Sequence, residues 1–217
     1  DIDIQVNWSS GWQGVAGKIP VVDFSTSFGA DGLEIPTGAD PVVIDYSEGF
    51  MQAQVRDALL AVSEFVYLSG DFAFRRGAST ELTVKTGLSS KSGVTANSIE
   101  FGANNVQAFV GVNGPYRTDS NHDGSVDTND SINPDAVGLV IDDFDFGMTI
   151  LNTVDSLDGV PKGTTFTALK AHGEDIGFVG FGDFIEFTLD DVNLAINTSN
   201  REGYVVDFTK NGSVDGY

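Results

Sequence analysis

Short runs of alternating apolar and polar residues recur along the chain, and they constrain its fold more than any other feature. They are rich in β-branched and aromatic residues and include residues 81–86, 98–101, 106–112, 137–141 and 184–196. A period of two places alternate side chains on one face of a β-strand. Gly-rich breaks recur between the runs, roughly every ten residues, as turns do in all-β proteins. The pattern predicts an all-β fold with Gly-rich turns, either a β-sandwich or a β-solenoid-like repeat.

Residues 51–66 are compatible with two structures. Apolar residues stand at i, i+4, i+7, i+8, i+11 and i+15, the spacing of one face of a helix, at Met51, Val55, Ala58, Leu59, Val62 and Val66. The alternative is two consecutive strands, residues 50–55 and 59–74, the second of which ends in an alternating segment. The sequence leaves both one short helix and two strands open, and either leaves the fold dominated by β-structure.

The charge of the chain excludes several classes of function. The 217 residues contain 32 Asp and Glu against 11 Lys and Arg, a formal net charge of −21, and no Cys. Nucleic-acid binding is excluded because phosphate contacts need a basic surface. The absence of Cys excludes disulfides, thiolate metal sites and a cysteine nucleophile. Since no segment approaches about 18 consecutive apolar residues, we expect no membrane insertion.

The most specific motif is D-x-N-x-D-G-x-V-D-x-x-D at residues 119–130. Ca²⁺ takes about 6 to 8 oxygen ligands, which a tightly folded loop supplies from alternate residues. The predicted ligands are Asp119, Asn121, Asp123, the carbonyl of Ser125, Asp127 and Asp130. Gly124 is predicted to form the sharp turn, and Val126 to point inward and attach the loop to the protein. Ca²⁺ is therefore the expected cofactor, with Mg²⁺ a weaker candidate because it demands stricter octahedral geometry.

A metal-free polar loop is the alternative, and electrostatics argues against it. Two like charges about 4 Å apart repel by about 4 kcal/mol at an effective dielectric constant of 20. Four carboxylates fall within residues 119–130, and no Lys or Arg lies between Arg117 and Lys162. A divalent cation would remove this repulsion.

The loop resembles those of EF-hands and especially dockerins, whose motif also ends in Asp. The resemblance covers residues 119–130 alone. Pro134 disfavours the helix that follows the loop in those families, and the second loop of a dockerin is missing. The best second candidate, residues 207–215, lacks acids at its third and fifth positions. Neither cohesin binding nor a calmodulin-like switch is therefore implied, and we expect a calcium loop inserted between strands.

Weak internal similarity suggests tandem repeats. Residues 109–111 resemble 178–180, and residues 141–146 resemble 189–194. The first pair is separated by 21 residues more than the second, as if a loop had been inserted after residue 111. We expect a module over residues 1–204 with the calcium loop inserted at 117–134, and the start of a following repeat at 205–217.

Other groups of residues carry weaker signals. The chain has two histidines, and neither lies in a recognisable catalytic triad. Neighbouring acids at 142–143 and 190–191 point to opposite faces of a strand, so each pair supplies at most one carboxylate to a glycosidase-like site. We therefore expect no enzymatic activity. Trp8, Trp12 and Tyr116 could form a sugar-stacking platform, with packing in the core or at an edge as the alternative.

The combination of a cysteine-free, Asp- and Gly-rich β-repeat with a calcium loop resembles the repetitive regions of large secreted or surface-anchored bacterial proteins, such as calcium-dependent adhesins. The resemblance implies a non-enzymatic structural or adhesive module outside the cell or on its surface. Its partners would be adjacent repeats of the same polypeptide. The alternative is a carbohydrate-binding module with a structural calcium site, whose partners would be cell-surface glycans or polysaccharides.

Overall fold

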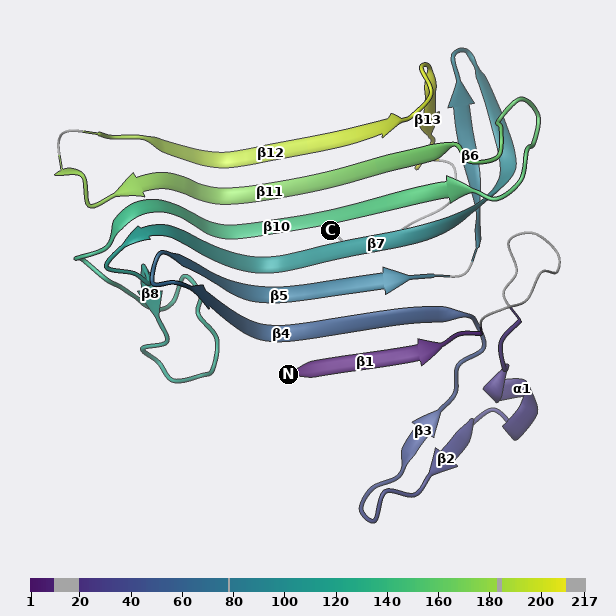
Figure 1. Ribbon diagram of the computed structural model, residues 1–217, viewed down its shortest axis with the longest axis horizontal. Helices are drawn as coiled ribbons and strands as arrows, with labels where there is room; N and C mark the ends of the chain where they lie inside the picture. Colours follow the sequence, from purple (N-terminus) through teal and green to yellow (C-terminus); the bar gives the residue numbers. More distant parts are fainter. Residues whose placement is uncertain (10–19, 78, 183–184, 210–217) are drawn as a thin grey trace.

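The computed structural model describes residues 1–9, 20–77, 79–182 and 185–209 (Figure 1). Its elements in chain order are β1 (Ile2–Asn7), α1 (Phe24–Phe28), β2 (Leu33–Ile35), β3 (Val42–Ile44), β4 (Phe50–Val62), β5 (Val66–Arg76), β6 (Thr80–Thr86), β7 (Ser89–Val112), β8 (Arg117–Thr118), β9 (Ser131–Ile132), β10 (Val137–Thr153), β11 (Thr165–Val179), β12 (Thr188–Ser199) and β13 (Tyr204–Val206). The predicted all-β class is confirmed. Within the described residues, no helix is long and apolar enough to cross a membrane.

The long strands form one antiparallel sheet in the order β1-β4-β5-β7-β10-β11-β12. At one end, β6 pairs with the first part of β7 and with β13, and these strands run across the direction of the others (Figure 1). The antiparallel pairing favours the sandwich-like alternative over a solenoid, which stacks repeats along an axis.

The helical alternative for residues 51–66 is wrong. Residues 50–62 form β4, a turn with positive φ at Ser63 and Glu64 follows, and β5 begins at Val66. The register between β4 and β5 shifts between Val55 and Ala58, where a β-bulge adds a residue. One extra residue changes which side chains share a face of the strand. Because of this bulge, the apolar residues of two alternating segments together have the spacing of one face of a helix.

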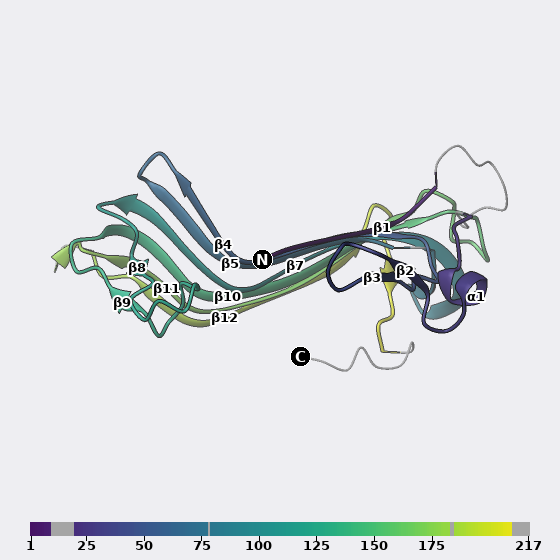
Figure 2. The ribbon, with the colours of Figure 1, turned by 90° about the horizontal axis from the view of Figure 1, so that it is seen from below.

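Similar irregularities form a line across the sheet. Positive φ angles occur at Asp57 in β4, Gly70 in β5, Asn105 in β7, Asp143 in β10 and Asp191 in β12. Asp, Asn and Gly adopt this conformation more readily than other residues. Bulges increase the local bend and twist of a sheet, and all the long strands bend in this region (Figure 2).

The line of bulges explains part of the internal sequence similarity. In residues 141–146 and 189–194, the second acid of the Asp-Asp pair has φ of +49° (Asp143) and +55° (Asp191). The two segments therefore place an aspartate with positive φ at the bend of the sheet in both β10 and β12.

Two apolar clusters lie at opposite ends of the sheet. The first joins β6, β7, β10, β11 and β13 and includes Val84, Val94, Leu151, Phe166 and Val206. The second is centred on residues of β7 and β10 beside the β8–β9 segment. Between these clusters the sheet is a single layer (Figure 2). Because Val206 is buried in the first cluster and β13 pairs with β6, residues 205 and 206 pack within the described module. Of the predicted start of a following repeat at 205–217, residues 210–217 lie outside the described residues.

Candidate metal-binding loop

Residues 119–130 connect β8 to β9, and both short strands lie within the connection from β7 to β10. The pairs Arg117–Ile132 and Thr118–Ser131 close the base of the loop. The equivalent connection between β11 and β12, residues 180–187, is much shorter. The expected insertion of this loop between two strands is therefore confirmed.

The first half of the loop gathers three of the predicted ligands around one backbone N–H group. The N–H of Asp123 donates to Asp119 Oδ1 at 3.2 Å and to Asn121 Oδ1 at 3.0 Å. The N–H of Gly124 donates to Asp119 Oδ2 at 3.2 Å. Gly124 has φ of +94°, a conformation that glycine adopts without steric cost. The first, third and fifth positions of the motif thus lie together, as predicted.

The second half of the loop is closed by Asp130, which is buried. Its Oδ1 accepts the N–H of Ser120 at 2.8 Å, and its Oδ2 accepts the N–H of Asp127 at 3.0 Å. These backbone hydrogen bonds, of which the one from Asp127 is the strongest cause, lower the pKa of Asp130. The carboxylate of Asp127 accepts the N–H of Asn129 at 2.7 Å. In this arrangement Asp130 closes the loop, a role that the motif alone did not indicate.

The loop fits a hard cation in its chemistry more than in its geometry. All six predicted ligands offer oxygen, the donor that Ca²⁺ prefers. Across the described parts of the chain, however, no group of three or more His, Asp or Glu side chains is arranged to hold a metal ion. Asp119, Asn121 and Asp123 already lie close to one another, whereas the carboxylates of Asp127 and Asp130 are engaged with N–H groups. Binding would therefore require the second half of the loop to adjust.

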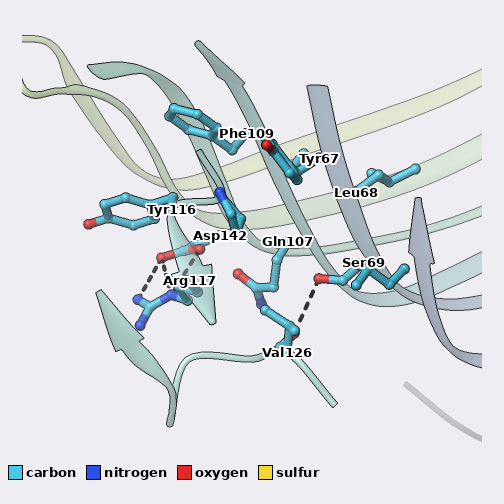
Figure 3. A pocket seen from close by; sticks show the side chains of 12 residues that line it. Tyr67, Leu68, Ser69, Gln107, Phe109, Tyr116, Arg117, Val126 and Asp142 are labelled. Atoms are coloured by element: carbon cyan, nitrogen blue, oxygen red, sulfur yellow. Dashed lines mark hydrogen bonds and ion pairs between the residues drawn. The ribbon is translucent and has the colours of Figure 1, made fainter. Parts of the chain in front are cut away.

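Two contacts attach the loop to the β4–β5 hairpin. Ser125 Oγ donates to Asp57, the residue with positive φ at the bulge of β4. Ser69 Oγ of β5 donates to the carbonyl of Val126 at 3.3 Å (Figure 3). The Val126 side chain is partly buried and lines a cavity against the sheet. Its predicted inward position is confirmed.

A buried ion pair attaches the base of the loop to β10. Arg117 Nη2 and Nε donate to Asp142 Oδ2 at 2.7 and 3.1 Å, and the side chains are 12% and 7% exposed (Figure 3). Arg117 Nη1 donates to the carbonyls of Thr128 and Asp130 at 3.3 and 3.0 Å. The side-chain amide of Gln107 satisfies both its oxygen and its nitrogen when the nitrogen donates to Asp142 and the oxygen accepts the N–H of Asp143. The hydrogen bond to Asp142 raises the pKa of Arg117, so one guanidinium group links the sheet to the second half of the loop.

Of the three aromatic residues predicted as a sugar-stacking platform, Trp8 and Tyr116 are described, and they lie near opposite ends of the sheet. The Tyr116 ring stacks against Phe109 with centroids 6.5 Å apart, and burial raises the pKa of Tyr116. The cavity beside these rings has a volume of about 20 Å³, room for about one water molecule. Trp8 follows β1 near the opposite end of the sheet, where Arg76 lies 4.6 Å from the centroid of its ring. Trp12 lies outside the described residues.

The remaining acids do not form a second site of the predicted kind. Asp142 is occupied by Arg117, whereas Asp143 sits at a bulge, where burial and the neighbouring Glu174 raise its pKa. His172 Nδ1 lies 3.5 Å from Asp191 Oδ1 at the exposed end of the line of bulges. In the weak second motif, Asp207 pairs with Lys85 at 3.4 Å, and residues 210–215 lie outside the described residues.

Sequence reasoning missed the residues that hold the loop to the sheet, namely Asp57, Ser69, Gln107, Arg117 and Asp142. Arg117 had one detectable signal, because it is the last cation before the acidic stretch. The hairpin residues had none, since only folding brings them to the loop.

Comparisons with protein-family models, curated protein sequences and solved structures gave no match for this chain. The loop and its contacts are therefore the features of this chain that indicate a function.

Proposed function

We propose that this chain is a non-enzymatic structural or adhesive module of a large extracellular bacterial protein, stiffened by Ca²⁺ in the loop 119–130. The observation that carries the proposal is the position of the loop. It contacts the β4–β5 hairpin through Ser125 and Val126 and β10 through Arg117. It therefore connects strands on two sides of β7 at the bend of the sheet.

Bound Ca²⁺ would offset part of the negative charge of the loop and draw its oxygens toward one centre. Asp119, Asn121 and Asp123 would contribute side-chain oxygens from the half of the loop where they already converge. The Ser125 carbonyl, Asp127 and Asp130 would complete the ligand set after the second half of the loop adjusts. Because Ser125 also contacts the bulge residue Asp57, ordering the loop would restrict the bend of the sheet.

The acidity of the loop makes this ordering dependent on the metal. Four carboxylates in residues 119–130 repel one another, and Arg117 is the cation that lies against them. A loop that becomes rigid on binding Ca²⁺ suits a module that works outside the cell, in a chain of adjacent repeats. Adhesion then follows from a stiff, extended array rather than from a catalytic site.

Isothermal titration of the purified chain with CaCl₂ tests the proposal. We expect one Ca²⁺ bound per chain, and binding of Mg²⁺ at least about tenfold weaker because of its stricter octahedral geometry. The double variant Asp119→Asn, Asp123→Asn removes two charged ligands and should lose the binding isotherm.

Asp135→Asn is the matched control for this titration. It removes the same charge from an exposed acid a few residues beyond the loop. We expect its calcium isotherm to match that of the wild type. Equal loss of binding in the control, or no heat of binding in the wild type at millimolar Ca²⁺, would contradict a site in this loop.

A further inference from the structure

One face of the sheet is almost entirely apolar. A row of paired residues crosses β1, β4, β5, β7, β10, β11 and β12 through Ile4, Ala53, Phe74, Phe101, Met148, Leu169 and Ile196. The parallel row nearer the bend contains Ile2, Val55, Phe72, Phe146 and Leu194. Beyond the bend, the row Leu60, Leu68, Ala108, Ile141, Ile176 and Leu189 continues the pattern. We call this surface the apolar face.

The residues between these rows point to the other side and are mostly polar. One such row contains Gln5, Gln52, Arg75, Glu100 and Thr149. Beyond the bend, Asp142 points toward Arg117 of the β8–β9 segment, so its neighbour Ile141 points away from the loop. At the other end, Leu151 packs with Val206 of β13, and Ile150 points away from β13. The apolar face is thus the side opposite the loop and β13.

No described element covers the apolar face. In Figure 2, β8, β9 and α1 lie toward the opposite side of the sheet, and β13 packs on that side through Val206 and Leu151. Many of its side chains are exposed, including Ile4 at 69%, Leu194 at 50% and Ile196 at 41%. Ile2, Leu60 and Leu189 of the same rows are also exposed, at 73%, 53% and 43%. A continuous exposed apolar surface of this kind marks an interaction site, since the largest apolar patch on a typical monomer covers only roughly 300–600 Å².

We propose that two copies of this chain pack apolar face against apolar face and complete a β-sandwich between them. The three rows name 18 apolar residues on each copy, close to the roughly 20–30 residues that each partner contributes to a stable interface of about 800 Å² per partner. Sheets pack face to face about 10 Å apart through interdigitating apolar side chains. A surface that packs against its own copy about a two-fold axis needs no second partner.

The distribution of charge selects a second copy over other occupants. In the three rows that define the face there is no Asp or Glu. The net charge of −21 therefore resides elsewhere on the molecule. Face-to-face packing turns the acidic surfaces of both copies outward, where water and salt screen their repulsion. The same charge disfavours a membrane carrying anionic lipids as the occupant.

Analytical ultracentrifugation of paired variants tests the inference. Ile4→Glu with Leu194→Glu places charges on the apolar face, at two side chains that are already exposed in the monomer. Gln5→Glu with Ala195→Glu makes similar substitutions on the same strands, pointing to the opposite face. We expect a wild-type dimer at micromolar concentration and a dissociation constant raised by more than about 100-fold in the first variant. The second variant should remain dimeric.

The absence of Cys in the chain allows a second measurement that does not depend on the charged variants folding. An environment-sensitive fluorophore on Leu194→Cys should shift to shorter wavelength as protein concentration rises, whereas the same label on Ala195→Cys should not. A wild-type monomer up to about 100 μM, or a dimer weakened equally by both variant pairs, would overturn the proposal. So would a monomer that binds neutral phosphatidylcholine vesicles, which would assign the face to lipid.

Discussion

Arg117→Ala is expected to lower the free energy of unfolding by about 3–5 kcal/mol, the cost of leaving one partner of a buried ion pair without its counter-charge. Asp142 is 7% exposed and would keep only its hydrogen bond from Gln107. The substitution also removes the donors to the carbonyls of Thr128 and Asp130. Chemical denaturation at one fixed protein concentration measures the change, because any dimer makes stability depend on concentration.

Lys85→Ala is the comparison for this variant. Lys85 is 49% exposed and pairs with Asp207 at 3.4 Å. Asp207 also accepts hydrogen bonds from the backbone N–H and hydroxyl of Thr209, so we expect a loss below about 1 kcal/mol. Replacing both partners, Arg117→Met with Asp142→Leu, should restore much of the stability lost by Arg117→Ala. Equal small losses in Arg117→Ala and Lys85→Ala would show that the buried pair does not hold the loop to the sheet.

Phe166→Ala is expected to cost about 3–5 kcal/mol, because it removes a large side chain from a closely packed cluster. Phe166 is 1% exposed and lies among Val84, Val94, Leu151 and Val160, the residues that join the crossing strands to the long sheet. Hydrogen bonds such as that from Asn197 Nδ2 to the carbonyl of Val206 also hold β13, but this cluster supplies the apolar packing between the crossing strands and the ends of β10 and β11. The same denaturation experiment reports the loss, and near-ultraviolet circular dichroism reports the packing of the neighbouring Tyr204.

Phe65→Ala provides the matched aromatic control. Phe65 follows the β4–β5 turn and is 55% exposed, so its truncation removes little buried area. We expect a change below about 1 kcal/mol. If Phe166→Ala were as mild as Phe65→Ala, the cluster would not be the part of the core that fixes this end of the sheet.

The strands could be predicted from period-two alternation because one face of most of them is apolar. The sequence left two alternatives open where the chain adds a residue. In β4 the bulge at Asp57 shifts the alternation, and residues 51–66 then imitate a helix. No local pattern distinguishes the two, since pairing of β4 with β1 and β5 decides between them. The bend across the sheet was likewise not predictable from one strand.

The candidate site was likewise predictable from the sequence only in part. Spacing within residues 119–130 was enough to predict the turn at Gly124, the proximity of Asp119, Asn121 and Asp123, and the inward position of Val126. The contacts of Ser125 with Asp57 and of Arg117 with Asp142 join residues 68 and 25 positions apart. They depend on sheet order, which the sequence does not display. Alternation predicted an apolar face, but only the arrangement of all strands shows that the described chain leaves it uncovered.

Differential scanning calorimetry with and without calcium shows whether Ca²⁺ in the loop 119–130 stiffens the module. At free Ca²⁺ about 100 times its Kd, binding should add about 2.7 kcal/mol to the free energy of unfolding. For a chain of this size, that raises Tm by about 5–10 °C relative to EDTA. The variant Asp119→Asn, Asp123→Asn should show the same Tm in both conditions. A wild-type Tm that is identical in EDTA and in millimolar Ca²⁺ would contradict the account.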